Sequence, residues 1–294
     1  MLELRGVGFS YPNAEQPALA DINLRIAPGE CLGLLGSNGA GKTTLLSLIA
    51  GLRQPQLGEA LWNDQRSIGL IPQQPAFYGG LSVRENLQLF ADLYGLRSAK
   101  RAARLAACLH STRLEKLLEQ RAANLSGGQQ RRLNFAIGLL QPAALYLFDE
   151  ATVGVDTQSR QLLLEAVEQL TGEGSAVIYT SHYLEEIERL AHRILILDEG
   201  KVRLDLDKRQ MLGDDHGLLL EWPGAAPAGL DALFAELKLL PLATPNGCRI
   251  ERIDAAQLAC LCQFIASQPQ QPNLLRFGRP SLEQLYLHIN GGQV

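Results

Sequence analysis

Hydrophobic residues along the chain form short unbroken runs that alternate with stretches of helical spacing. Three runs, Cys31–Leu35, Leu145–Phe148 and Ala176–Tyr179, are continuously apolar. Such runs are typical of strands buried on both faces of a parallel sheet. Apolar residues recur at helical spacing from about Arg84 to Leu139 and again over Gln158–Leu170. Strands that alternate with helices in this way predict an α/β domain with a mainly parallel sheet.

The pattern changes near residue 213, where a Gly-Asp-Asp linker is followed by a different order of elements. The tail is expected to run strand, helix, strand, strand, helix, strand, at residues 218–222, 230–237, 239–243, 248–253, 255–267 and 274–277. That order is the one found in ferredoxin-like folds. A last helix is expected over Ser281–Ile289. We therefore expect a first domain over residues 1–212 and an accessory α+β domain over residues 213–294.

Composition narrows the class of protein without deciding it. Of the 294 residues, 46% are hydrophobic and 20% are charged, which excludes a disordered chain. The net charge of -4 argues against a nucleic-acid partner, because proteins that bind nucleic acid usually carry a basic excess. No apolar stretch approaches the roughly 18 residues of a membrane span, and the N-terminus lacks the apolar segment of a signal peptide. Five cysteines without CxxC spacing indicate free thiols rather than a metal site.

A glycine-rich loop follows the first buried run. Residues 36–43 read Gly-Ser-Asn-Gly-Ala-Gly-Lys-Thr and fit the pattern G-x-x-x-x-G-K-[ST] between a strand and a helix. Glycines let the backbone wrap around phosphate groups, and the helix N-terminus favours negative charge. Lys42 is expected to reach the β- and γ-phosphates, and the Thr43 hydroxyl is expected to bind Mg²⁺. The loop therefore predicts a nucleotide site.

Two further strand ends carry polar groups that suit this site. Asp149 and Glu150 directly follow the second buried run. A parallel strand that ends beside the phosphate loop places Asp149 near Mg²⁺ and lets Glu150 act as a general base toward water. His182 follows the third run, at the edge where open α/β sheets bind their ligands.

The segment Leu125-Ser126-Gly127-Gly128-Gln129 decides between families of phosphate-loop proteins. Together with the loop and the Asp-Glu pair, the sequence over residues 1–210 resembles the ATPase subunit of an ABC transporter, whose Leu-Ser-Gly-Gly-Gln signature is complete here. The resemblance implies a P-loop NTPase of the ABC ATPase type, with an antiparallel β subdomain and a helical subdomain at about residues 75–135. The signature argues against a P-loop kinase or GTPase.

The resemblance also implies a role for each matching residue. Tyr11 stacks on adenine, and Gln73 is the glutamine that touches Mg²⁺ and senses the membrane partner, with its neighbour Gln74 as the alternative. The phosphate-binding Walker A residues are Gly36, Ser37, Asn38, Gly39, Ala40, Gly41, Lys42, Thr43 and Thr44.

The remaining matches lie in the second half of the first domain. Asp149 is implied to be a Mg²⁺ ligand together with Thr43 and Gln73. Glu150 is implied to be the catalytic base, and His182 the switch histidine at the γ-phosphate. The residues implied to meet the other subunit of a dimer are Ser126, Gly127, Gly128 and Asp156.

Two differences from the usual family pattern follow the Asp-Glu pair. Ala151 stands where the family usually has Pro, which is expected to alter local stiffness and not the chemistry. Val153-Gly154-Val155-Asp156 is similar to the variant common in exporters of drugs, lipids and polysaccharides. The resemblance implies a homodimer, or a heterodimer with another ABC ATPase, that binds two ATP molecules with Mg²⁺ and drives export through a separate transmembrane permease. The implied location is cytoplasmic, at the inner face of the membrane. A soluble ABC ATPase on a non-membrane complex and an ATP-driven signalling clamp remain as alternatives.

Overall fold

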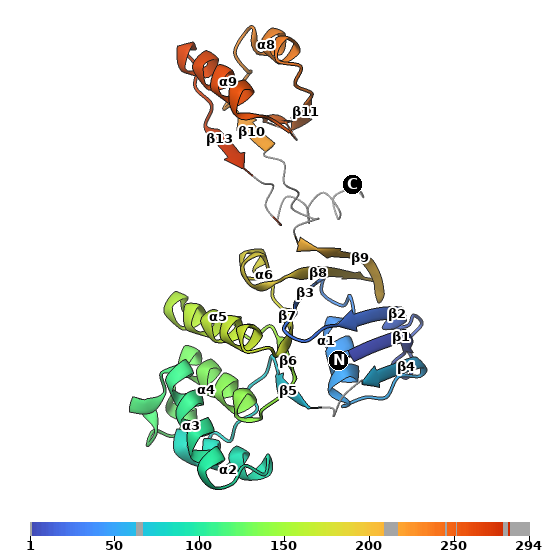
Figure 1. The fold of residues 1–294 in the computed structure, drawn as a ribbon, viewed down its shortest axis with the longest axis vertical. Coiled ribbons are helices and arrows are strands. Elements are labelled where there is room, and N and C mark those ends of the chain that lie inside the picture. The colour runs from blue at the N-terminus through green and yellow to red at the C-terminus, as the bar shows by residue number, and fades with distance from the viewer. Residues whose placement is uncertain are drawn as a thin grey trace. The chain divides into compact units, whose positions relative to one another are not determined.

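The chain separates into two units, Met1–Lys208 and Arg209–Val294 (Figure 1). The computed structural model describes residues 2–62, 67–208, 217–244, 246–250, 252–278 and 282. The domain boundary that we expected after residue 212 lies outside the described residues. Within these residues, no helix has both the length and the hydropathy that a membrane span requires.

Six strands form the central sheet of the first unit, in the order β5-β6-β7-β3-β8-β9. Their bounds are β3 (Cys31–Leu35), β5 (Ile68–Ile71), β6 (Leu145–Asp149), β7 (Ala176–Thr180), β8 (Arg193–Asp198) and β9 (Lys201–Asp207). Five strands are parallel, and β9 pairs antiparallel with β8 at the edge. Every residue of β3, β6 and β7 is buried, which explains their unbroken apolar sequences. The predicted α/β class is confirmed.

A second sheet of the first unit is antiparallel and has the order β2-β1-β4. It consists of β1 (Leu2–Phe9), β2 (Leu19–Ile26) and β4 (Leu57–Trp62). The helix α1 (Lys42–Ala50) shares one hydrophobic core with both sheets, because Leu24 of β2, Leu46 of α1 and Leu147 of β6 belong to the same buried cluster. This core fixes the start of α1 against the carboxyl ends of the central strands.

The helical part of the first unit is divided where the sequence showed one long helical pattern. Its helices are α2 (Val83–Leu93), α3 (Ser98–Thr112) and α4 (Gly127–Leu140), with 3₁₀ turns η1 (Glu115–Leu117) and η2 (Ala122–Asn124) between α3 and α4. The helix α3 stops at Arg113, which has the left-handed φ of 51°. Two more helices, α5 (Thr157–Gly172) and α6 (Leu184–Leu190), pack against β7 and β3 respectively.

The second unit has the element order strand, helix, strand, strand, helix, strand. The elements are β10 (Gly217–Glu221), α8 (Leu230–Glu236), β11 (Pro241–Thr244), β12 (Gly247–Ile250), α9 (Ala255–Ser267) and β13 (Leu274–Gly278). The strands form an antiparallel sheet in the order β11-β12-β10-β13. This is a ferredoxin-like arrangement. The last helix that we expected lies outside the described residues, apart from Leu282.

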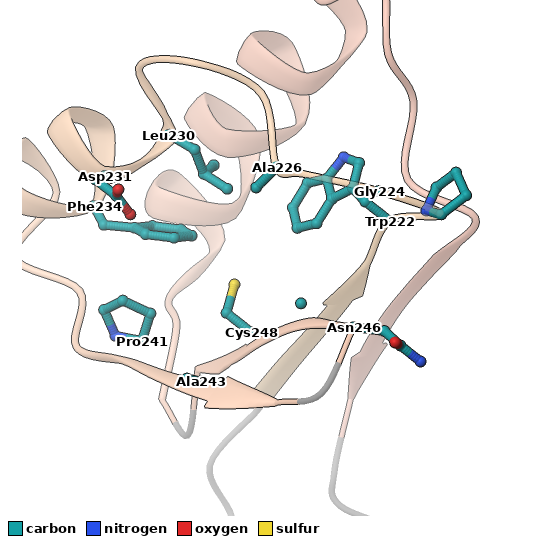
Figure 2. A pocket seen from close by; sticks show the side chains of 12 residues that line it. Trp222, Gly224, Ala226, Leu230, Asp231, Phe234, Pro241, Ala243, Asn246 and Cys248 are labelled. Atoms are coloured by element: carbon teal, nitrogen blue, oxygen red, sulfur yellow. The ribbon is translucent and has the colours of Figure 1, made fainter.

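A cavity of about 570 Å³ lies within the second unit, between α8 and the strands β11 and β12. Figure 2 shows the side chain of Cys248 pointing from β12 toward the space between Phe234 and Trp222. Phe234 and Trp222 are themselves almost completely buried and belong to the core of this unit. The Cys248 thiol is therefore half-buried at the cavity wall rather than on the outer surface.

Candidate active site

The glycine-rich loop joins β3 to α1, and two of its positions admit only glycine. The φ angles are 155° at Gly36 and 104° at Gly41. A Cβ atom at Gly36 would lie 2.4 Å from the carbonyl oxygen of Leu197, and one at Gly41 would lie 2.6 Å from that of Ala18. The loop therefore passes close to the backbone of Leu197 and Ala18. It leads directly into the first turn of α1, whose unpaired backbone N–H groups favour an anion.

Lys42 is the first residue of α1, and its side chain is buried inside this loop. Its Nζ atom donates hydrogen bonds to the carbonyl oxygens of Gly36 (2.8 Å) and Ser37 (3.0 Å). Burial lowers the pKa of Lys42, while the charges of Glu150 and Asp149 oppose that shift. The loop thus holds a cation close to two carboxylates.

The Asp149-Glu150 pair stands at the carboxyl end of β6 and is fixed by the neighbouring strand β7. The hydroxyl of Thr180 accepts a hydrogen bond from the backbone N–H of Glu150 (2.9 Å). The same hydroxyl donates to Oδ1 of Asp149 over 3.2 Å. Glu150 has a φ of 49°, which is uncommon for a residue with a side chain. Such a conformation persists where surrounding contacts determine it, and it is frequent at functional sites.

The carboxylate of Glu150 contacts side chains from two other loops of the first unit. Gln73, which follows β5, donates from Nε2 to Oε2 of Glu150 over 2.7 Å. His182, which follows β7, places its Nε2 atom 2.7 Å from Oε1 of Glu150. Glu150 is itself only 8% exposed. Three residues that are far apart in the sequence are therefore brought together as one cluster.

This cluster lines one side of a cavity of about 560 Å³ whose other side is the glycine-rich loop. The residues that line it are Tyr11, Ala18, Asn38, Gly39, Gly41, Lys42, Thr43, Thr44, Gln73, Glu150 and His182. Ten of these eleven residues were predicted for the site from the sequence, and Ala18 is the exception. The volume of this cavity falls in the range of small-molecule binding sites.

Tyr11 forms the aromatic part of the cavity wall. Its hydroxyl lies 3.1 Å from Oγ1 of Thr44, and its ring meets Phe9 edge to face at 5.2 Å. The guanidinium of Arg53 lies 4.8 Å from the centre of the Tyr11 ring. Tyr11 is 38% exposed, so that part of its ring is accessible.

The protein family of this chain follows from its similarity to known proteins. The family model described as "ABC transporter" matches residues 19–153. The Nod factor export ATP-binding protein I of Paraburkholderia xenovorans (strain LB400) is 31% identical over 100% of this chain and 98% of its own length. The linearmycin resistance ATP-binding protein LnrL of Bacillus subtilis (strain 168) is 32% identical, over 99% of this chain and 98% of its own. The chain belongs to the ABC transporter family.

Solved structures of ABC proteins agree with this assignment. A protein described as the ATP-binding subunit of an ABC transporter superposes with a TM-score of 0.66 at 30% identity, covering 72% of this chain and 91% of its own. The ATP-binding cassette MJ0796, in a dimeric post-hydrolysis state bound to ADP and Pi, superposes with a TM-score of 0.64 at 28% identity. The match covers 70% of this chain and 98% of the MJ0796 chain. The predicted ABC ATPase fold and the prediction of an ATPase are confirmed, and the chain binds ATP.

The predicted signature residues Ser126, Gly127 and Gly128 do not line the cavity beside the glycine-rich loop. Ser126 begins α4 in a capping box, in which its Oγ accepts from the backbone N–H of Gln129 (3.4 Å) and Gln129 accepts from the Ser126 N–H (2.9 Å). Asp156 begins α5, and its hydrogen bond from the Ser159 N–H (2.9 Å) lowers its pKa. A Cβ atom at Gly128 would lie 2.6 Å from Oδ2 of Asp156. The two helix starts are therefore neighbours on one surface.

The remaining predicted residues complete the loop and the strand end. Gly36, Ser37 and Ala40 belong to the glycine-rich loop, and Asp149 is the buried last residue of β6. Gly127 is exposed beside Ser126 in the first turn of α4.

Two residues that shape the site, Arg53 and Thr180, were not predicted from the sequence. Arg53 follows the end of α1, and no local pattern links it to Tyr11, 42 positions earlier by residue number. Thr180 is the last residue of β7, two positions before His182. A polar residue in a buried strand was a usable signal for Thr180, because a buried hydroxyl needs a hydrogen-bond partner.

Proposed function

We propose that this ABC ATPase is the energy-coupling subunit of an exporter, with a separate transmembrane subunit. The observation that carries the proposal is the cluster at Glu150, whose carboxylate meets Gln73 and His182 beside the glycine-rich loop. Support for export comes from the relatives named for Nod factor export and linearmycin resistance, which match nearly the whole chain.

The cavity suits ATP with its triphosphate on the glycine-rich loop. Lys42 binds the β- and γ-phosphates, because its ammonium is held inside the loop. Tyr11 packs against adenine through its exposed ring face, since an aromatic side chain meets a flat base over a large area.

The donors beside the loop fit Mg²⁺. Thr43 contributes a hydroxyl, Gln73 an amide oxygen and Asp149 a carboxylate, and oxygen donors of this kind are those that Mg²⁺ prefers. These three residues would hold the ion, which neutralises charge on the phosphate oxygens when it is bound. Because Mg²⁺ keeps several ligands from water and phosphate, three protein donors are sufficient.

Glu150 acts as the general base in hydrolysis. It takes a proton from a water molecule as the water oxygen attacks the γ-phosphorus, and the bond between γ-phosphorus and the bridging oxygen of ADP breaks. His182 and Gln73 orient the Glu150 carboxylate through their contacts of 2.7 Å each. A second proposed contact of His182 is with the γ-phosphate, which is supported by its place in the same cavity as the glycine-rich loop.

A second ATPase subunit completes each site. Ser126, Gly127, Gly128 and Asp156 do not line the cavity beside the glycine-rich loop. The sequence contains one Leu-Ser-Gly-Gly-Gln segment and one such loop. In the proposed dimer, the surface of one subunit closes over ATP bound in the cavity of the other. The dimeric form of the MJ0796 cassette is consistent with this arrangement.

The transmembrane partner is proposed to bind the segment before α2. Asn86 is completely buried and holds the backbone of Tyr78 by two hydrogen bonds, from the Tyr78 N–H (2.8 Å) and to its carbonyl oxygen (3.0 Å). The Tyr78 side chain is nevertheless 57% exposed. A rigid segment with an exposed aromatic side chain suits a protein partner. The protein would then be cytoplasmic and bound to the inner face of the membrane.

We further propose that residues 213–294 form an accessory domain for dimer stability or regulation. Its ferredoxin-like sheet and its own hydrophobic core support a separate role from the ATPase unit.

Co-purification tests the proposed function. The tagged Glu150→Gln chain is expressed in its native host, membranes are solubilised gently, and the complex is captured with ATP. We expect a polytopic membrane protein in fixed stoichiometry with the ATPase, and less of the ATPase dimer in a parallel capture without nucleotide. Recovery of the chain alone from the soluble fraction, or together with ribosomes, would contradict the exporter role.

A further inference from the structure

A buried carboxylate outside the predicted catalytic set joins two of the loops that carry that set. Glu186 lies in the first turn of α6 and is 3% exposed. Its Oε2 atom accepts hydrogen bonds from three hydroxyl groups, those of Thr152 (2.7 Å), Tyr179 (2.9 Å) and Ser181 (2.7 Å). All three donor residues are buried as well.

The donors come from the segments next to Glu150 and His182. Thr152 is two residues beyond Glu150, in the stretch that leads to Asp156. Ser181 directly precedes His182. The Oγ atom of Ser181 also accepts a hydrogen bond from the backbone N–H of Tyr183, which directly follows His182 (3.0 Å). One carboxylate oxygen therefore ties the histidine loop to the segment after Glu150.

Charge and burial make this junction specific to a carboxylate. The Nε atom of Arg160 lies 3.4 Å from Oε1 of Glu186, which is within ion-pair distance, although the two atoms are not hydrogen-bonded. The guanidinium of Arg160 also lies 4.0 Å from the centre of the Tyr183 ring. Burial, and then the charge of Glu186, raise the pKa of Tyr179 well above its usual range, so that Tyr179 stays protonated and donates.

A buried charge is costly unless hydrogen bonds and an opposite charge compensate it. Here three hydroxyls and one guanidinium do so. Two of the hydroxyls come from the segments beside Glu150 and His182, the third comes from Tyr179 of β7, and the guanidinium comes from Arg160 of α5. A carboxylate with these partners fixes one arrangement of its neighbours, because an apolar residue at the same place would leave three buried hydroxyls without their acceptor.

We propose that Glu186 is a positioning residue for ATP hydrolysis, which holds the His182 loop against the segment after Glu150 so that Nε2 of His182 meets the Glu150 carboxylate. This inference rests on the proposed function of those two residues. Glu186 acts through Ser181 and Thr152, since its own carboxylate is engaged by them.

The first test compares two neighbouring glutamates in the full chain. Glu186→Gln keeps the shape of the side chain and removes its charge, and the matched control Glu185→Gln removes a charge from an exposed position one residue earlier. We expect Glu186→Gln to lower kcat for ATP hydrolysis about tenfold, with the Kd for ATP changed less than twofold. Glu185→Gln should leave both values unchanged. An unchanged kcat in Glu186→Gln would overturn the proposal.

A double-mutant cycle separates positioning from a general loss of stability. Under single-turnover conditions, Glu186→Gln should slow hydrolysis in the wild-type background but change it less than twofold in a His182→Ala background, because the loop it holds then carries no imidazole. An equal loss in both backgrounds would overturn the proposal. If Glu186→Gln unfolds below the assay temperature, Ser181→Ala, which removes one hydroxyl only, takes its place in the cycle.

The same cycle distinguishes failure of this inference from failure of the proposed function. A His182→Ala chain that hydrolyses ATP at the wild-type rate refutes the role proposed for His182, and the positioning role of Glu186 with it. A slow His182→Ala chain whose rate is not coupled to Glu186 refutes the inference alone.

Discussion

The Nε2 atom of His182 lies 2.7 Å from Oε1 of Glu150, although the two residues follow different strands of the central sheet. This distance is set by the parallel pairing of β6 and β7, in which Asp149 is opposite Thr180. Since the two parallel strands end at the same edge of the sheet, the residues that follow them meet there. Gln73 reaches the other oxygen of the same carboxylate from β5, the next strand of the sheet.

Replacing Glu150 by Gln should separate ATP binding from hydrolysis. The amide keeps the size of the side chain but cannot accept a proton from water, and general-base catalysis is worth about 10²- to 10⁴-fold. We expect kcat to fall by that factor while ATP still binds and promotes dimerisation. Phosphate release and size-exclusion chromatography with ATP measure the two properties, and wild-type turnover in this variant would refute the role of Glu150.

Replacing Lys42 by Ala should instead weaken nucleotide binding. Its ammonium is held inside the glycine-rich loop, and a hydrogen bond to a charged group is worth about 1.5–3 kcal/mol. We expect the Kd for ATP to rise by roughly 10- to 100-fold. Equilibrium binding of a fluorescent ATP analogue measures the change, with exposed Lys201 replaced by Ala as the control. Equal affinity in the two variants would contradict the assignment.

The wall formed by Tyr11 can be dissected with three substitutions. Tyr11→Ala removes the ring and should cost about 1–3 kcal/mol of ATP binding, the range for stacking of a base on an aromatic side chain. Tyr11→Phe keeps the ring and loses only the contact with Thr44, so that we expect little change. Arg53→Ala removes the cation that packs on the ring and should give an intermediate loss. Isothermal titration with ATP and GTP measures these differences, and a loss in Tyr11→Phe as large as in Tyr11→Ala would exclude stacking.

Much of the central sheet was readable from the sequence because each buried strand is continuously apolar. The runs starting at Cys31 and Leu145 become β3 and β6 with the expected positions. The helical stretch was less readable, since its apolar spacing continues across the turns at Gly95 and Arg113, where positive φ angles end the helices. Periodicity alone does not report such a break.

The tail shows the same limit for short strands. Residues 248–253 were expected to form one strand, whereas β12 is Gly247–Ile250 and Asp254 caps the next helix. At Gly247 a Cβ atom would lie 1.9 Å from the carbonyl oxygen of Leu220. The start of β12 therefore depends on a close approach between two strands, which one segment of sequence does not contain.

The chemistry of the site was readable by residue type, but its supporting contacts were not. Motif spacing placed Glu150 and His182 in the site, because both follow buried strands. The contacts of Thr180 with Glu150 and of Arg53 with Tyr11 depend on how distant segments pack, and no local pattern encodes them. Residues that position other residues are therefore the ones that sequence reasoning misses here.

The five cysteines should react in an order set by their burial. Cys31 and Cys108 are buried, and burial raises their pKa values to about 12 and about 11, so that both thiols stay protonated at pH 8. Since the thiolate is the reactive form, we expect a water-soluble maleimide to label the exposed Cys260 and Cys262 first. Cys248, half-buried at the cavity wall of Figure 2 and with its pKa raised by burial, should follow more slowly.

Mass spectrometry of time points at pH 8 measures this order in the intact chain. All five thiols should react at similar rates in denaturant, which controls for intrinsic reactivity. A Cys260→Ser, Cys262→Ser variant isolates the slower Cys248, because the two fast thiols are then absent. Labelling of Cys31 as fast as that of Cys260 in the native protein would contradict the burial of β3, since a reagent of that size reaches Cys31 only when the central sheet opens.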